Sequence, residues 1–160
     1  MVLSPSTCDK ILLTKRGVLT MTKIGIISDT HGSLSSKIFE IFSGVDIILH
    51  AGDIVGDHLI DELKTISEVV AVHGNMDTHQ TSQIFPRQTT IEKDGIKIHL
   101  SHKDGLNISN VDVVVQGHTH LAEINKRDGI FFINPGKASE SVILMETDQA
   151  KITDIKIIFL

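Results

Sequence analysis

Residues that bind metal ions recur directly after short apolar runs in this sequence. The pattern begins with Asp29 and His31, which follow the isoleucine-rich run at 23–28. An Asp-x-His pair is weak evidence by itself, because short polar segments at strand ends commonly serve only as turns or caps. The same residue types follow four later apolar runs, as Asp53, as Asn75, as His102, and as His118 with His120. Because open α/β sheets place ligands beyond the carboxyl ends of their strands, we expect these side chains to meet at one edge.

The chemistry of this set indicates two metal ions. Two aspartates, one asparagine and four histidines are more donors than one cation with about four to six ligands needs. They suit two cations that share a carboxylate. In two-metal sites the ions lie ~3.5–4 Å apart, where they hold a phosphoryl group and generate hydroxide from water. Glycine next to four of the five groups lets the backbone turn sharply and approach a ligand closely.

Hydrophobic patterning predicts the elements that position these residues. Buried strands are expected at 23–28, 46–51 and 68–73, with helices at 33–43 and 57–66 between them. This repeat is typical of parallel strands joined by right-handed crossovers. The second half is mostly β, with strands expected at about 88–92, 96–101, 111–116, 123–126, 130–134, 141–146 and 151–159. We therefore expect an α/β fold of two sheets packed face to face, with the helices outside.

Composition sets the class of protein. The chain has 160 residues, 41% of them hydrophobic, which suits one folded domain. We expect this domain at 23–160, after an N-terminal extension at 1–22 that is disordered or loosely packed. A net charge of −5 with scattered basic residues gives no nucleic-acid footprint. No apolar run approaches the ~20 residues of a membrane span, and a single cysteine, Cys8, fits a reducing cytoplasm.

The order of the motifs resembles that of the calcineurin-like metallophosphoesterases. The family pattern D-x-H, G-D, G-N-x-D, H and G-H-x-H appears here as Asp29-Thr30-His31, Gly52-Asp53, Gly74-Asn75-Met76-Asp77, His102 and Gly117-His118-Thr119-His120. The short length and Asn134-Pro135-Gly136 look like the small prokaryotic phosphodiesterase branch. The resemblance covers the chain from Lys23 onwards and implies a four-layer α/β/β/α sandwich of two mixed β-sheets flanked by short helices.

The resemblance also implies a ligand set and an activity. One metal would take Asp29, His31 and His120, the other would take Asn75, His102 and His118, and Asp53 would bridge them. Asp53, Asn75 and His102 are the catalytic candidates. Two divalent transition ions are implied, with Mn²⁺ first and Fe, Zn²⁺ or Ni²⁺ as the other candidates, because this nitrogen and oxygen set suits them better than Ca²⁺ or Mg²⁺. The implied activity is phosphodiester hydrolysis of a small phosphate ester by hydroxide.

Three positions depart from the family pattern. Met76 stands where several relatives have a histidine or cysteine that assists the leaving group. The thioether of Met76 has no proton to transfer. His73 is a candidate substitute, although a hydrogen-bonded loop histidine is an equally good interpretation. Lys137 stands where a small residue is usual, either near a substrate phosphate or as an exposed turn residue. The segment 103–110 is too short for a helical crossover, so that rim is open or covered by another subunit of a homo-oligomer.

The remaining polar candidates receive structural interpretations. His50 is expected to be buried and to orient Asp53, and Asp77 to hold its loop. His58, His79 and His99 are expected to be solvent-facing or structural. The alternative function is a non-catalytic protein-binding scaffold of the same fold, like a retromer subunit that has lost metal ligands. No G-x-G-x-x-G or G-x-S-x-G motif supports a nucleotide-binding module or a serine hydrolase.

Overall fold

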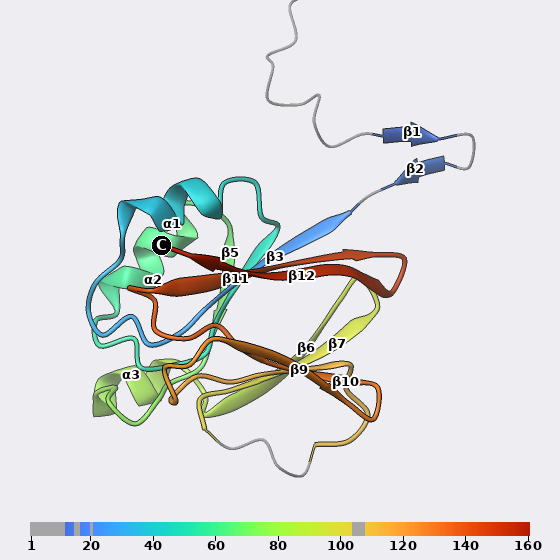
Figure 1. Cartoon of the computed structure of the whole chain (residues 1–160). Helices are drawn as coiled ribbons and strands as arrows, with labels where there is room; N and C mark the ends of the chain where they lie inside the picture. The colour runs from blue at the N-terminus through green and yellow to red at the C-terminus, as the bar shows by residue number, and fades with distance from the viewer. Residues whose placement is uncertain (1–11, 15–16, 20, 104–107) are drawn as a thin grey trace, which may run out of the picture.

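The fold is a sandwich of two mixed five-stranded sheets with short helices (Figure 1). The computed structural model describes residues 12–14, 17–19, 21–103 and 108–160. The first sheet has the order β12-β11-β3-β4-β5, and its strands are β3 Thr22–Ile27, β4 Ile47–His50, β5 Glu68–Ala71, β11 Ser141–Asp148 and β12 Lys151–Phe159. The second has the order β6-β7-β8-β10-β9, and its strands are β6 Gln88–Lys93, β7 Ile96–Ser101, β8 Val113–Val115, β9 Glu123–Arg127 and β10 Ile130–Asn134.

The apolar runs form strands that are buried on both faces. In the first sheet β3, β4 and β5 are parallel, as expected, while β11 pairs with β3 in the antiparallel sense. Ile47 and Leu49 of β4 point into the core between the sheets, whereas Ile48 packs in the cluster with the helices. A strand covered on both sides needs a continuous apolar sequence, which is why these runs do not alternate.

In the second sheet, buried apolar residues alternate more clearly with exposed polar ones. Ile96, Ile98 and Leu100 of β7 lie in the core between the sheets, and Lys97 between them is exposed. The hairpin of β6 and β7 turns at Asp94 and Gly95, which both have positive φ. β7, β8 and β10 are parallel to one another. Their carboxyl ends therefore lie on the same edge of this sheet.

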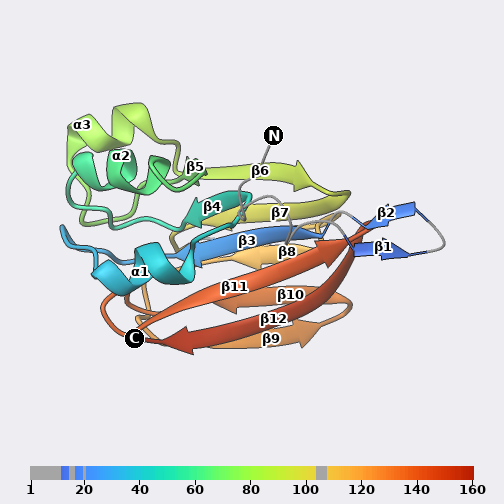
Figure 2. The same ribbon diagram turned by 90° about the horizontal axis from the view of Figure 1, so that it is seen from above.

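Two helices cover the outer face of the first sheet. They are α1 Ser36–Ile41 and α2 His58–Lys64 (Figure 2). Ile38, Leu59 and Leu63 are buried in the cluster beneath them. The expected spans 33–43 and 57–66 were longer, because the apolar spacing continues into turns at both ends. The side chain of Ser35 caps α1 by accepting a hydrogen bond from the Lys37 amide.

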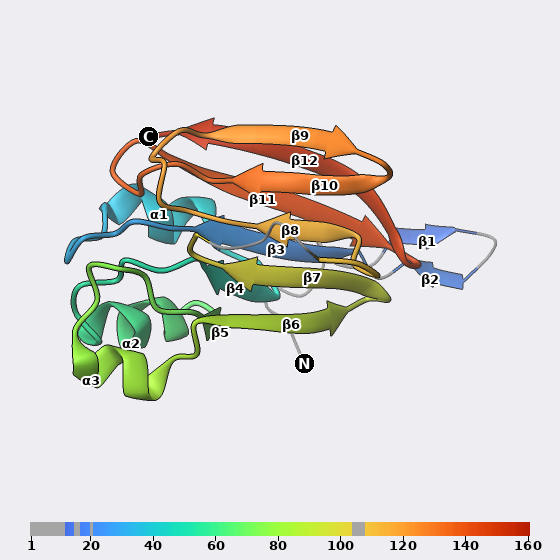
Figure 3. The same cartoon turned by 90° about the horizontal axis from the view of Figure 1, so that it is seen from below.

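A third helix, α3 His79–Ile84, was missed by the pattern. Thr81 is its one buried residue, so no apolar stripe marks it. α3 lies at one end of the sandwich, and in the part of the chain that the structure describes no helix crosses the outer face of the second sheet (Figure 3). The expected α/β fold of two mixed sheets with short helices is confirmed. Of the two helical layers in the expected α/β/β/α order, the described residues form the layer over the first sheet.

Two short strands that precede β3 form a small sheet of their own. Strands β1 Leu12–Thr14 and β2 Gly17–Leu19 pair only with each other, in a two-stranded antiparallel sheet. The predicted extension at 1–22 thus contains this hairpin and the first residue of β3, and its other residues before 21 lie outside the described part. None of the helices in the described residues has the length and apolar character needed to cross a membrane.

Candidate metal centre

The predicted ligands meet at the edge where parallel strands of both sheets end. Asp29 and His31 follow β3, Asp53 follows β4, and Asn75 follows β5 in the first sheet. From the second sheet, His102 directly follows β7, and His118 and His120 follow β8. All seven residues that the sequence indicated therefore come from the carboxyl ends of strands, as the rule for α/β sheets requires.

One cluster is centred on a carboxylate oxygen of Asp29. Its Oδ1 atom lies 3.2 Å from His120 Nε2 and 3.7 Å from His31 Nε2. The two histidine Nε2 atoms are 3.2 Å apart. Asp29 is fully buried, while His31 and His120 are more exposed, so the cluster opens to solvent on the histidine side.

A second cluster is centred on Asn75. Its Oδ1 atom lies 3.2 Å from His102 Nε2 and 3.0 Å from His118 Nδ1. His102 Nε2 also lies 3.3 Å from Asp53 Oδ2. Donor atoms of Asp29, Asp53 and His102 fall within 4.8 Å of one another, which connects this cluster to the first.

The hydrogen bonding around His102 shows why a cation fits here. In the neutral ring, Nδ1–H donates to the Ala51 carbonyl at 2.7 Å, so Nε2 carries the lone pair. The atoms facing Nε2 are oxygens of Asn75 and Asp53, which are also acceptors. Asp29 Oδ1 is likewise buried without a hydrogen-bond partner in the described part of the chain. Acceptors that face one another without donors are the arrangement a metal ion satisfies.

Most of the predicted ligands have a strained backbone conformation. Five of the seven predicted ligands have positive φ: Asp29 (53°), His31 (45°), Asp53 (53°), His118 (69°) and His120 (61°). Such conformations are uncommon for residues other than glycine and cost ~1–3 kcal/mol each. The surrounding fold therefore holds the side chains in place, since an unconstrained loop would relax to an ordinary conformation.

Hydrogen bonds outside the clusters orient the two carboxylates. Asp29 Oδ2 accepts from the Ser28 hydroxyl at 2.7 Å and from the His118 amide at 3.1 Å. Asp53 Oδ1 accepts from the Met76 amide at 2.8 Å. Each carboxylate thus uses one oxygen for the protein and directs the other toward the imidazoles.

Two glycines allow these close approaches. A Cβ atom at Gly74 would collide with the Asp53 carboxylate, and one at Gly117 would collide with Ser28 and Asp29. Both positions therefore require glycine for space. The lack of space for a side chain therefore explains why glycine precedes Asn75 and His118 in the two motifs.

His50 is a buried residue that hydrogen-bonds to the segments carrying Asp29 and Asp53. Its Nδ1 accepts a hydrogen bond from the Gly52 amide at 3.2 Å, so Nε2–H donates to the Thr30 hydroxyl at 3.0 Å. Thr30 in turn donates to the Ile54 carbonyl. Burial, with a smaller contribution from His102, lowers the pKa of His50 to about 3. His50 therefore fixes the backbone on both sides of Asp53, and contacts that carboxylate only indirectly.

Asp77 and His99 have structural contacts, as expected. Asp77 accepts from the amides of Val55 and Gly74, which ties the loop after β4 to the loop after β5. His99 is buried on β7, with Nδ1 2.9 Å from the Thr90 hydroxyl, and burial lowers its pKa. His58 and His79 are exposed, the latter with Nε2 3.1 Å from the Gln83 amide nitrogen.

His73 and Lys137, the two candidates for proton transfer or substrate binding, lie in different loops. His73 is half-buried beside the Asn75 loop, with Nδ1 3.4 Å from the Gly74 carbonyl. Lys137 lies in the turn before β11, where its carbonyl accepts hydrogen bonds from Glu140 and Ser141. Met76 is 58% exposed at the edge of the centre. Thr30 was not singled out from the sequence, although it lies inside the D-x-H motif.

Comparison with known proteins identifies the family to which the chain is similar. The family model for the calcineurin-like phosphoesterase superfamily domain matches residues 22–150. A probable metallophosphoesterase of Methanocaldococcus jannaschii is 37% identical over 131 residues; the match covers 71% of this chain and 66%, just under two thirds, of that protein. The phosphodiesterase YfcE of Escherichia coli K12 is 30% identical over 148 residues, covering 74% of this chain and 80% of that protein.

Solved structures share the architecture. Vps29 of Chaetomium thermophilum matches with a TM-score of 0.72 at 18% identity, covering 87% of this chain and 97% of that one. At this identity the likeness concerns the fold alone. It places the two-sheet sandwich among known structures without bearing on the chemistry of the centre.

Proposed function

The chain belongs to the calcineurin-like phosphoesterase superfamily, and on this premise we propose that it is a dinuclear metal-dependent phosphodiesterase. One observation carries the proposal: carboxylate, amide and imidazole acceptors from both sheets face one another at distances of 3.0–3.7 Å. The likeness to a phosphodiesterase of Escherichia coli supports a diester as the substrate.

Each proposed ion takes three donors and shares a fourth. The ligands are Asp29, His31 and His120 for one ion, Asn75, His102 and His118 for the other, and Asp53 between them. Divalent transition ions suit this set, with Mn²⁺ first and Fe, Zn²⁺ or Ni²⁺ as alternatives. When bound, the two ions would lower the pKa of water to supply a nucleophile and would neutralise phosphoryl charge.

The chain's own residues set the geometry of this chemistry. His102 keeps its Nε2 lone pair directed at the centre because the Ala51 carbonyl holds the Nδ1 proton. Asp53 presents Oδ2 to the centre because the Met76 amide holds Oδ1. Both side chains are buried, so water does not compete for their orientation. Asn75 adds its Oδ1 atom, which lies 3.2 Å from His102 Nε2. We propose Asp53, Asn75 and His102 as the catalytic residues on this basis.

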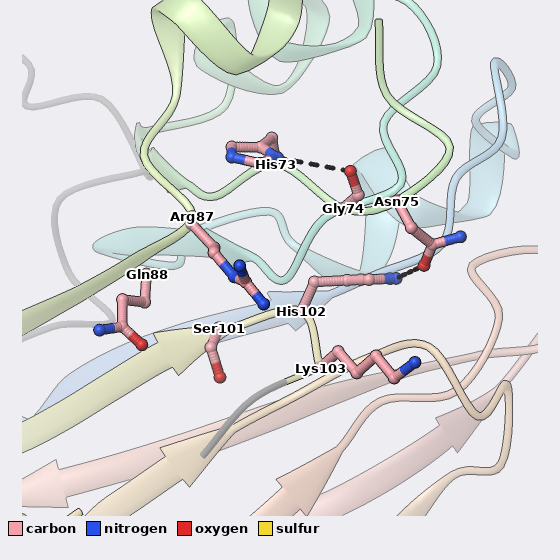
Figure 4. Close-up of a pocket in the computed structure, with 8 residues that line it drawn as sticks. All are labelled: His73, Gly74, Asn75, Arg87, Gln88, Ser101, His102 and Lys103. Carbon is pink, nitrogen blue, oxygen red and sulfur yellow. Dashed lines mark hydrogen bonds between the residues drawn. The ribbon is translucent and has the colours of Figure 1, made fainter. Parts of the chain in front are cut away.

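The side chain that donates a proton to the leaving group is harder to identify than the proposed metal ligands. Met76 stands at the rim and its thioether has no proton to transfer. His73 lies two residues before Asn75, and His73, Asn75 and His102 line one cleft of about 290 Å³ (Figure 4). This position supports His73 as the substitute donor. Lys137 is retained as a candidate for contact with a substrate phosphate.

The scaffold alternative predicts loss of metal ligands, and here all seven predicted donors are present and brought together. The two functions are separated by metal analysis of the purified full chain, followed by assay of bis-nitrophenyl phosphate with Mn²⁺. The phosphodiesterase proposal expects two ions per chain and hydrolysis that a chelator abolishes. A protein that binds no divalent ion and hydrolyses no phosphomonoester, phosphodiester or cyclic nucleotide would instead support the scaffold.

A further inference from the structure

The loop that carries His118 and His120 contains a strained three-residue turn. The Thr119 amide donates a hydrogen bond to the Gly117 carbonyl at 2.8 Å, and His118 between them has a φ of 69°. A hydrogen bond between residues i and i+2 around a central residue of positive φ is the pattern of a γ-turn that is rare and strained. Other contacts must therefore hold this turn in place.

Asn134, the last residue of β10, supplies such contacts. It is 4% exposed, and its Nδ2 group donates to the Gly117 carbonyl at 2.8 Å and to the Thr119 hydroxyl at 2.9 Å. Its Oδ1 atom accepts from the Gly136 amide at 2.9 Å. Because a carbonyl can only accept and a backbone amide can only donate, these partners fix the direction of the Asn134 side-chain amide. Both ends of the turn are thus tied to one buried side chain.

The segment after Asn134 is fastened to the first sheet. The Pro135 carbonyl accepts from the Ser141 hydroxyl at 2.6 Å, and Ser141 is the first residue of β11. The Ala138 amide donates to the Ser28 carbonyl at 3.0 Å, next to the first of the predicted ligands. Asn134 itself belongs to the second sheet. A side chain held between two sheets has the rigid support that is needed to position other groups.

The turn carries one donor for each proposed ion. His118 Nδ1 lies 3.0 Å from Asn75 Oδ1 in the second cluster. His120 Nε2 lies 3.2 Å from Asp29 Oδ1 in the first cluster. Thr119 separates the two histidines in the chain, and both of them have positive φ. The conformation of this turn therefore sets the position of one donor relative to the other.

The three hydrogen bonds of Asn134 require an amide of this length. Aspartate would place an acceptor against the Gly117 carbonyl, and leucine, which has a similar shape, would form none of the three bonds. Gly136 also has a defined role, because its φ is 77° and a Cβ atom there would lie 2.6 Å from Ser141 Oγ. The Asn134-Pro135-Gly136 motif thus has a physical explanation in the support of the neighbouring turn.

We propose that Asn134 is a positioning residue of the metal centre, which holds the strained turn at His118 and thereby places one ligand of each ion. The proposal rests on the dinuclear centre proposed above. Asn134 acts through the turn and binds neither ion. Contacts that orient the ligands of a metal from outside typically account for about 10–100-fold in metal affinity or activity.

Thr119→Val removes the hydroxyl with little risk to the fold, because Thr119 is exposed and valine keeps its branched shape. With the full chain, we expect calorimetry to show Mn²⁺ binding about tenfold or more weaker at both sites. The Tm of the chelated protein should stay close to that of the wild type. Thr119→Ser, which keeps the hydroxyl, should bind Mn²⁺ like the wild type.

Asn134→Leu is the second variant. Thr119→Val also removes a hydrogen bond from the Leu121 amide, which Asn134→Leu leaves in place. Asn134→Leu should therefore weaken Mn²⁺ binding at both sites as well, measured at a temperature where the chelated variant is folded. It should also speed hydrogen exchange of the Thr119 amide in the chelated protein, a readout that needs no bound metal.

The matched controls are Thr153→Val on β12 and Asn125→Leu on β9, which change exposed residues outside the centre and should keep the wild-type affinity. Unchanged Mn²⁺ affinity in both Thr119→Val and Asn134→Leu, whatever their Tm, overturns the positioning role. If the wild type still binds two ions, the dinuclear centre stands. If the wild type binds no divalent ion, the proposed function fails, and exchange of the Thr119 amide alone decides whether Asn134 holds the turn.

Discussion

The buried state of His50 predicts a specific sensitivity of the fold to acid. Its pKa is about 3 in the folded protein, against 6.5 in the unfolded chain, and burial is the main cause. A lowered pKa means that the unfolded chain binds a proton that the folded chain does not. The free energy of unfolding is therefore fully retained above pH ~6.5 and falls by up to ~1.4 kcal/mol per pH unit below it.

The magnitude follows from the two pKa values. Between about pH 7.5 and about pH 5, the folded-state pKa of about 3 leaves His50 neutral, and the linkage amounts to ~2 kcal/mol. In a domain of this size ~2 kcal/mol corresponds to a fall in Tm of ~4–8 °C. Other histidines also titrate in this range, so the effect must be measured as a difference between proteins.

His50→Asn provides that difference. The asparagine Oδ1 can accept the Gly52 amide hydrogen bond that Nδ1 accepts now, and it does not titrate. Urea unfolding with a chelator present would compare both proteins at pH 7.5 and 5. We expect the variant to be less stable at pH 7.5, and its deficit to shrink by ~2 kcal/mol at pH 5.

The matched control is His79→Asn, which removes an exposed imidazole on α3 and should keep the pH dependence of the wild type. A stability difference between wild type and His50→Asn that stays constant across this range would refute the reasoning. It would mean that His50 is protonated, or reaches water, in the folded state.

Three further predictions concern the metal centre. Asp53→Asn should abolish loading of both ions and hydrolysis while leaving the circular dichroism spectrum unchanged; two ions per chain with normal turnover would contradict the shared role. Met76→His should raise kcat/KM by ~10²-fold or more for esters with alcohol leaving groups, and much less for nitrophenyl esters, because an acidic leaving group needs no proton. Equal dependence on leaving-group pKa in both proteins would point to an existing donor, His73 first. Adding Mn²⁺ at ~100 times its Kd should stabilise the protein by ~2.7 kcal/mol over the chelated form, and Asp29→Asn should remove this gain; a gain of the same size in the variant would exclude Asp29 as a ligand.

The sequence predicted the parts of this fold that have a strong local signal. The isoleucine- and valine-rich runs became buried strands because a sheet covered on both faces needs continuous apolar sequence. The residues proposed as metal ligands directly follow these runs, so their position at the carboxyl ends of strands could be predicted from the sequence. α3 had no such signal, since Thr81 is its one buried residue and Thr78 caps it.

The finer parts of the centre depend on contacts between distant segments. The Met76 amide reaches Asp53 across 23 residues, and the His102 ring reaches the Ala51 carbonyl across 51. No local spacing encodes such pairs. The cleft beside the second cluster was missed for the same reason, because its lining residues come from the loop after β5 and from both strands of the β6–β7 hairpin, which come together only in the folded chain.

The strain at the centre and the identity of Met76 together limit the chemistry. Positive φ at five of the proposed metal ligands is sustained by the fold, so the proposed centre is formed before a substrate arrives. The neighbouring side chain that would donate a proton is an exposed thioether instead. If the proposed function holds, a preformed centre that stabilises charge well and protonates poorly favours esters whose leaving group departs as a stable anion.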